Sequence, residues 1–165
     1  MQVEVKFIHS ADLHLGRALT GFRHLPQPVF DRLENSVYRS LERIVATAIA
    51  HHVDFVLLAG DLFDEQSANL KAHIRLQQQL ERLDQHGIQT FICHGNHDPF
   101  HPHAFPLAWP ESVFVFTDEK VSAVPFYKKD RLAAMSYGFS YTGKHISQNK
   151  TAEYVKTKDD CFHIG

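Results

Sequence analysis

Three short apolar segments, each followed at once by a polar cluster, constrain the fold of this chain more than any other feature. They cover residues 3–10, 53–59 and 88–93. Between them, apolar residues recur at steps of three and four over residues 28–51 and 68–86, as in amphipathic helices. The order strand, helix, strand, helix, strand indicates parallel pairing with right-handed crossovers. We therefore expect an α/β fold whose first sheet is parallel.

The pattern changes after residue 98, where several prolines mark a long loop. Short β-like segments follow at residues 113–116, 121–125 and 131–137, and another begins at residue 161. A short helix is expected over residues 148–156. These segments predict that a second sheet begins in this half of the chain.

Composition narrows the class of protein. A chain of 165 residues with 44% apolar content suits one compact domain, and the charged Glu4 and Lys6 stand where a secretory signal would be apolar. We expect a cytoplasmic protein with no membrane span. The net charge of −2 argues mildly against nucleic-acid binding, whereas the 13 histidines suggest a metal site.

Polar residues stand at the end of each predicted strand. They are Asp12 and His14 after the first, Asp61 and Asp64 after the second, and Asn96, His97 and Asp98 after the third. The carboxyl ends of parallel strands meet at one edge of a sheet, where ligands bind. Carboxylate, imidazole and amide oxygen are ligands of divalent cations, and a carboxylate can bridge two of them. The sequence therefore predicts a metal centre at this edge.

The three clusters in order, DLH, GDLFD and GNHD, resemble the motifs of the calcineurin-like metallophosphoesterase superfamily. The stretches FIHSADLHLGR and LLAGDLFD are similar to the branch of DNA-repair exonucleases that includes Mre11 and SbcD, and especially to its YhaO-type members. The resemblance implies a layered αββα sandwich. It also implies that residues 1–165 are the N-terminal part of one nuclease domain, with an incomplete second sheet.

The resemblance further implies two divalent metal ions, with manganese as the expected metal. Asp12 and His14 would bind the first ion, Asp61 would bridge the two, and Asn96 would bind the second. His97 would be the catalytic histidine, which assists the leaving alkoxide or orients the phosphate. A metal-activated hydroxide would attack the phosphorus.

Two acidic residues take supporting roles in this interpretation. Asp98 would hold His97 in its working orientation, and Asp64 is a weaker candidate for supporting a ligand from behind. The family's later elements, a histidine on a further strand and a Gly-His-x-His motif, have no counterpart here, and His163 is expected to precede such a ligand position. We therefore predict weak metal binding and little activity for residues 1–165.

The same branch implies DNA as the substrate and an SbcC- or Rad50-like ATPase as the partner. An unpaired edge of an incomplete second sheet would favour a homodimer. Basic side chains that could contact a phosphate backbone, or could simply be solvated, are Arg17, Arg23, Lys128, Lys129 and Arg131. Aromatic side chains that could stack on bases, or could pack in loops, are Phe22, Phe100 and Phe105.

Other interpretations stay open. The polar residues could be strand-end caps and turn formers, since Asp and Asn favour turns. His9 and His94 are expected to be core or near-site histidines rather than ligands. The chain could be a small-molecule phosphodiesterase or phosphatase of the same superfamily. It could also be a metal-free interaction module that keeps the fold without the chemistry.

Overall fold

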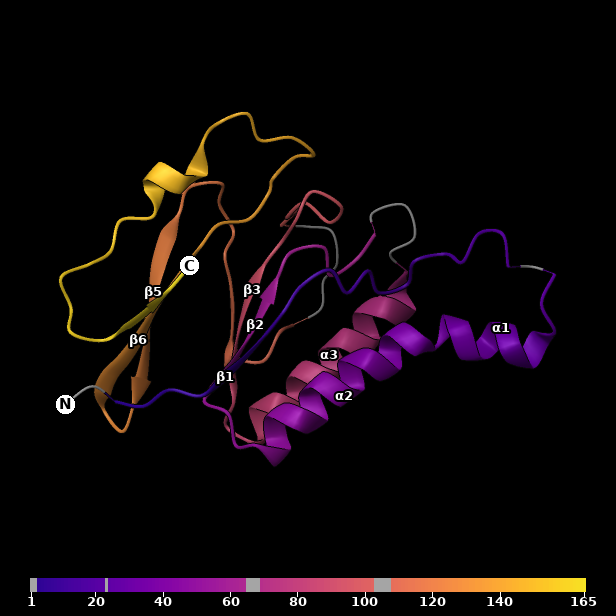
Figure 1. Ribbon diagram of the computed structural model, residues 1–165, viewed down its shortest axis with the longest axis horizontal. Helices are drawn as coiled ribbons and strands as arrows, with labels where there is room; N and C mark the ends of the chain where they lie inside the picture. The colour runs from indigo at the N-terminus through magenta and orange to yellow at the C-terminus, as the bar shows by residue number, and fades with distance from the viewer. Residues whose placement is uncertain (1–2, 23, 65–68, 103–107) are drawn as a thin grey trace.

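The computed structural model describes residues 3–22, 24–64, 69–102 and 108–165, which form two sheets and a helical layer (Figure 1). The strands of the first sheet, in pairing order, are β1 (Phe7–Ser10), β2 (Phe55–Ala59), β3 (Gln89–Cys93) and β4 (Val113–Val115). All three pairings are parallel. The prediction of an α/β fold with a parallel first sheet is confirmed, and the segment near residue 113 joins this sheet as its fourth strand.

The second sheet is mixed. Its strands pair in the order β5 (Ser122–Lys128), β6 (Arg131–Gly138) and β7 (Phe162–Ile164), with β5 antiparallel and β7 parallel to β6. The helix expected over residues 148–156 is a 3₁₀ turn, η1 (Lys150–Glu153). The prediction that a second sheet begins in this half of the chain is therefore confirmed.

In the described residues, three helices accompany the first sheet: α1 (Gln27–Glu34), α2 (Ser36–Ala50) and α3 (Leu70–Gln85). The single helix predicted over residues 28–51 is interrupted at Asn35, where side chains bond to the backbone of the preceding turn. The Asn35 amide donates to the Asp31 carbonyl at 2.7 Å, and the Ser36 hydroxyl donates to the Leu33 carbonyl at 2.6 Å. Side-chain bonds of this kind compete with the helical ladder.

The first sheet lies between the helices and the second sheet (Figure 1). Along β2, successive side chains point to opposite faces. Val56 and Leu58 pack with α2 and α3, whereas Phe55 and Leu57 pack with the second sheet. All four are buried, which confirms the buried strand that the sequence predicted. Burial on both faces fixes the sheet as the middle layer of the fold.

The first strand differs from its prediction as a buried segment over residues 3–10. It begins at Phe7, and His9 is exposed. In the described part of the chain β1 lies at an edge of the sheet order, so its side chains are covered less than those of β2. His9 lines a cavity of about 210 Å³ between the two sheets, so of the two places expected for it, in the core or near the site, the core is excluded.

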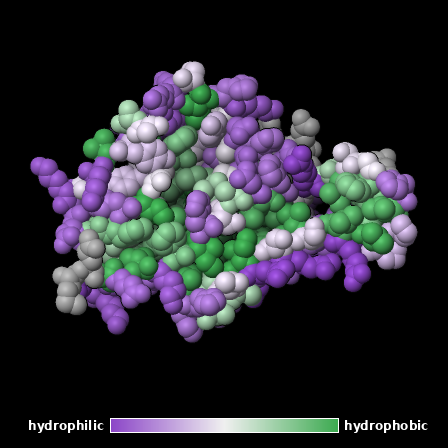
Figure 2. Space-filling model, in the orientation of Figure 1, coloured by the Kyte–Doolittle hydropathy of each residue, from purple (hydrophilic) through white to green (hydrophobic). Residues whose placement is uncertain are grey.

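The outer surface includes an apolar patch over α1. Figure 2 shows apolar side chains gathered at the end of the molecule that α1 forms, where Phe22, Val29 and Leu33 are between 38% and 44% exposed. Among the described residues, no helix combines the length and the apolar character that crossing a membrane requires.

Candidate metal centre

The loops that follow β1 and β2 run side by side and continue the parallel pairing of these strands. The amides of Asp12, His14 and Leu15 donate to the carbonyls of Gly60, Asp61 and Leu62, at 3.1, 2.9 and 2.7 Å respectively. Leu13 and Leu15 of the first loop and Leu62 and Phe63 of the second are buried in the core beneath. The loops are therefore held from below by packing and from the side by backbone hydrogen bonds.

The backbone of these loops adopts an uncommon conformation. Asp12, His14 and Asp61 have φ angles of 55°, 46° and 51°, in the left-handed region that residues other than glycine rarely visit. Backbone strain of this kind gathers at functional sites, where the surrounding structure enforces it. Here three residues that the sequence predicts as metal ligands carry it.

These three residues form one cluster. Ligand atoms of Asp12, His14 and Asp61 all lie within 4.8 Å of one another. The His14 Nδ1 atom is buried and has no hydrogen-bond partner in the structure. An unpaired buried polar atom is costly unless something binds it. The three side chains therefore converge, as the sequence predicts. Two carboxylates and an imidazole nitrogen without a partner are donors that fit a divalent cation.

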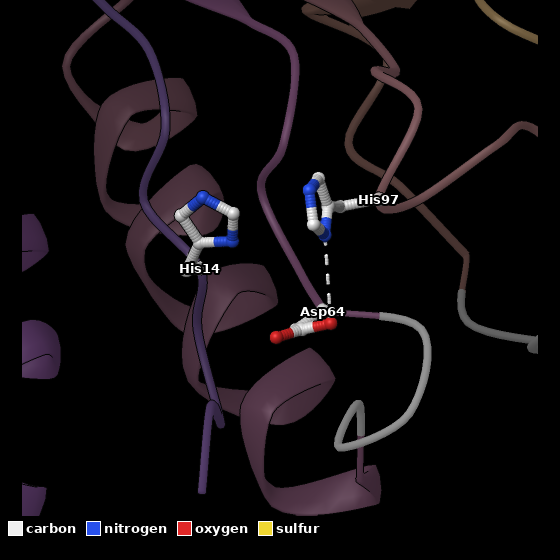
Figure 3. Close-up of side chains that lie close together, drawn as sticks. All are labelled: His14, Asp64 and His97. Atoms are coloured by element: carbon white, nitrogen blue, oxygen red, sulfur yellow. Dashed lines mark ion pairs between the residues drawn. The ribbon is translucent and has the colours of Figure 1, made fainter. Parts of the chain in front are cut away.

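A second cluster shares His14 with the first. Ligand atoms of His14, Asp64 and His97 also lie within 4.8 Å of one another. Figure 3 shows the His97 ring directed toward Asp64, with its Nδ1 3.7 Å from the carboxylate, and the His14 ring beside it. The two imidazole ring centres are 5.2 Å apart. Asp64 therefore lies beside both histidines, and its supporting role stays a prediction.

The loop after β3 approaches the other two at Gly95. A Cβ atom added at Gly95 would lie 2.1 Å from the Asp61 Oδ1 atom, so only glycine allows this approach. The same Asp61 oxygen accepts the backbone N–H of His97 at 3.0 Å. Asp61 thus joins the second and third loops through one carboxylate.

Asp98 does not take the position that the sequence predicts. Its buried carboxylate accepts the backbone N–H groups of Asp61, Leu62 and Gly95, at 3.1, 3.0 and 2.8 Å. Its Oδ2 atom also lies 3.3 Å from the Nδ1 of His94. Asp98 therefore fixes the backbone of two loops and the ring of His94. The residue beside His97 is Asp64, which corrects the expected role of Asp98 as its orienting partner.

Asn96, the fourth predicted ligand, is exposed and lines a cavity together with Asp12 and Asp61. The cavity measures about 280 Å³, and Tyr141 and Tyr154, from the part of the chain around the second sheet, form its wall. Asn96 therefore faces the same space as the first cluster.

The histidines expected outside the metal set are engaged elsewhere. His94 is half-buried, and its Nδ1 lies 3.0 Å from the Asp98 carbonyl oxygen. The Nδ1 of His163 lies 2.9 Å from the hydroxyl of Tyr137, and its Nε2 lies 3.1 Å from the Asp159 carbonyl oxygen.

Burial raises the pKa of the Cys93 thiol to about 11, which keeps it protonated near neutral pH.

The basic residues that could contact a phosphate backbone do not lie together. Arg17 lies at the centre, with its Nε 3.7 Å from the Asp64 carboxylate. Lys128 lies on the second sheet and pairs with Asp54 at 2.8 Å. Arg23 and Phe105 lie outside the described residues.

The chain is similar in sequence to known phosphoesterases. The Calcineurin-like phosphoesterase family matches residues 5–164. A relative in Bacillus subtilis (strain 168), described as "Uncharacterized metallophosphoesterase YhaO", is 42% identical over the whole chain. The chain spans 40% of the length of that relative.

More distant relatives are described as "DNA double-strand break repair protein Mre11". The protein from Sulfurisphaera tokodaii is 29% identical over 76% of the chain, which corresponds to 29% of its own length. The protein from Aeropyrum pernix is 33% identical over 56% of the chain and 21% of its own length.

Proposed function

The chain belongs to the calcineurin-like phosphoesterase family, and from this premise we propose that it hydrolyses phosphodiester bonds of DNA as the exonuclease subunit of a DNA-repair complex. The observation that carries the proposal is the cluster of Asp12, His14 and Asp61 at the ends of parallel strands, with the His97 ring next to that of His14. The similarity to the Mre11 proteins supports DNA as the substrate. The matched region is less than a third of the length of each of these proteins.

We propose two divalent ions, manganese by preference, as the cofactors. Asp12 and His14 would hold the first ion, Asp61 would lie between the two, and Asn96 would hold the second. Bound cations would neutralise charge on the phosphoryl oxygens and activate water. The protein contributes a fixed arrangement of donors, because the backbone bonds described above hold the loops before any ligand binds.

His97 is the proton-carrying residue of this proposal. Its side chain is 48% exposed and therefore accessible to a substrate. Asp64, with a carboxylate oxygen 3.7 Å from Nδ1, orients the ring. The opposite nitrogen, Nε2, can then donate to a phosphate oxygen or to the leaving alkoxide. Asp64 takes here the orienting role that the sequence assigned to Asp98.

The partners are proposed on the same basis. An SbcC- or Rad50-like ATPase would bind the whole protein and deliver DNA to the site, and co-purification of the two tests this. A homodimer is a further proposal. Gel filtration at several protein concentrations tests it, and a monomer at every concentration would refute it.

Hydrolysis of linear duplex DNA tests the proposed function. The protein is incubated with Mn²⁺ and end-labelled DNA, and His97→Ala and a chelator serve as controls. We expect nucleotides to be released from the ends, with a rate at least roughly 100-fold lower in the variant because it loses the general acid. Resistance of DNA in a preparation that cleaves a small aryl phosphodiester would refute DNA as the substrate.

That outcome would favour a small-molecule phosphodiesterase of the same family. The net charge of −2 is the observation that supports this alternative, because proteins that bind nucleic acid usually carry an excess of cations.

A further inference from the structure

A second cavity, of about 220 Å³, lies beside the metal centre. It opens between the loop after β1, the start of α2 and the start of α3. Arg17, Tyr38, Asn69 and Lys71 are among the residues that line it. The proposed catalytic roles use none of these four residues.

Arg17 stands between this cavity and the metal centre. Its Nε lies 3.7 Å from Oδ2 of Asp64, and Oδ1 of the same carboxylate lies 3.7 Å from the Nδ1 of His97. The Arg17 side chain is 62% exposed. A guanidinium carries five N–H donors in a planar fork, so one edge can face Asp64 while another faces a bound anion. A group in the cavity and a group at the metal centre would both be within its reach.

The lining of the cavity also includes an aromatic ring and a second cation. Tyr38 is 6% exposed, and the Lys71 ammonium lies 5.6 Å from its ring centre. Glu34, the acidic residue of the lining, reaches the Lys71 ammonium only at 4.0 Å. The lining therefore holds two cations and one carboxylate, and the carboxylate that faces Arg17, Asp64, belongs to the metal centre.

We propose that this cavity is a subsite for the nucleotide unit next to the bond that is cleaved, and that Arg17 binds the phosphate of that unit. The inference rests on the proposed function and adds to it a binding site for the neighbouring nucleotide. An oligonucleotide would use both the metal centre and the subsite, whereas a small diester with a single phosphate would use the metal centre alone. Arginine is suited to this task because it pairs with phosphate through two parallel hydrogen bonds.

Binding without metal separates the subsite from the chemistry. A fluorescein-labelled thymidylate hexamer is titrated with the protein in EDTA, and the dissociation constant is measured by fluorescence anisotropy. For Arg17→Ala we expect a rise of roughly 10-fold, as for loss of one charge-assisted hydrogen bond. Lys71→Ala should raise it less. Arg43→Ala, an exposed cation on α2, is the matched control and should leave it within about twofold.

Two further measurements exclude a purely structural effect. In a plot of log affinity for the hexamer against log salt concentration, Arg17→Ala should reduce the slope by roughly the amount for one released ion. Arg17→Lys should restore the slope because lysine keeps the charge. A methylphosphonate hexamer, which lacks backbone charge, should not distinguish the variants. An unchanged dissociation constant and slope in Arg17→Ala would overturn the subsite, whether or not the protein cleaves DNA with Mn²⁺. Failure to cleave DNA with the binding effects intact would refute the proposed function alone.

Discussion

The two faces of the parallel sheet are packed by different sets of side chains, and one of these sets reaches the metal centre. On the helix side, the buried cluster is mainly aliphatic and includes Leu13, Leu15, Leu62 and Phe63 from the loops that carry the ligands. On the side of the second sheet, the cluster is smaller and is built around aromatic rings such as Phe55.

This difference indicates how the centre is held. The residues that come directly after Asp12, His14 and Asp61 in the chain are buried on the helix side, so the helix-side core fixes the loop backbone. The second sheet leaves a cavity of about 210 Å³ between the layers, and segments that connect its strands contribute Tyr141 and Tyr154 to the cavity at the centre. The geometry of the ligands should therefore depend on the helix-side core much more than on the contact between the sheets.

Truncation of one core side chain on each face tests this comparison with the largest expected effects. Phe55 and Leu15 are both 0% exposed. We expect Phe55→Ala to lower the free energy of unfolding by about 3–5 kcal/mol and Leu15→Ala by about 2–5 kcal/mol. Leu15→Ala alone should also weaken Mn²⁺ binding, because Leu15 adjoins His14.

Denaturant unfolding gives the two stabilities, and calorimetric titration of Mn²⁺ gives the affinities. Equal loss of metal affinity in both variants would show that the second sheet holds the centre as firmly as the helix-side core does.

Removal of the central carboxylate should have the next largest effect. Asp61 contributes to the first cluster and joins two loops through one oxygen. We expect Asp61→Ala to lower Mn²⁺ affinity at least roughly 100-fold, because even residues behind metal ligands contribute 10–100-fold. Asp84→Ala, which removes an exposed carboxylate from α3, is the matched control for charge. Unchanged Mn²⁺ binding in Asp61→Ala would exclude the first cluster as the metal site.

A methyl group placed between the second and third loops should have a smaller effect. Gly95→Ala would place its Cβ 2.1 Å from the Asp61 carboxylate, whereas a Cβ at Gly143 would meet nothing within 4 Å. We expect Gly95→Ala to weaken Mn²⁺ binding roughly 10-fold by displacing Asp61, and Gly143→Ala to leave it unchanged. Equal titration curves for the two variants would mean that the loops move apart without cost.

The smallest expected effect concerns the pH dependence of the helix-side core. Burial lowers the pKa of His73, whose ring stacks on Phe63 with centres 4.0 Å apart. A histidine with a lowered folded-state pKa takes up its proton more readily when unfolded, so its contribution to stability falls as pH drops below the ordinary value.

We therefore expect the free energy of unfolding to fall between about pH 7 and about pH 5, and His73→Gln to reduce this fall. Denaturant unfolding at several pH values measures it. A variant whose stability depends on pH as steeply as the parent would assign the effect to other histidines.

The strands were more predictable from sequence than the helix boundaries. Apolar runs such as residues 53–59 could be identified because burial on both faces requires a continuous apolar segment. The interruption at Asn35 was missed because the apolar period continues across it. The helix is interrupted because the polar side chains of Asn35 and Ser36 bind backbone carbonyls, and the spacing of apolar residues carries no information about such bonds.

The sequence by itself determined which residues meet. Asp12, His14 and Asp61 follow parallel strands directly, and the carboxyl ends of such strands share one edge whatever the details of packing. Tertiary structure alone decided how the supporting acids are used. Asp98 lies next to His97 in the chain, yet it binds loop amides and His94, and Asp64 faces His97 instead. The reason is that the directions of these side chains depend on how the three loops pack together, as at the contact of Gly95 with Asp61, and this packing exists only in the tertiary structure.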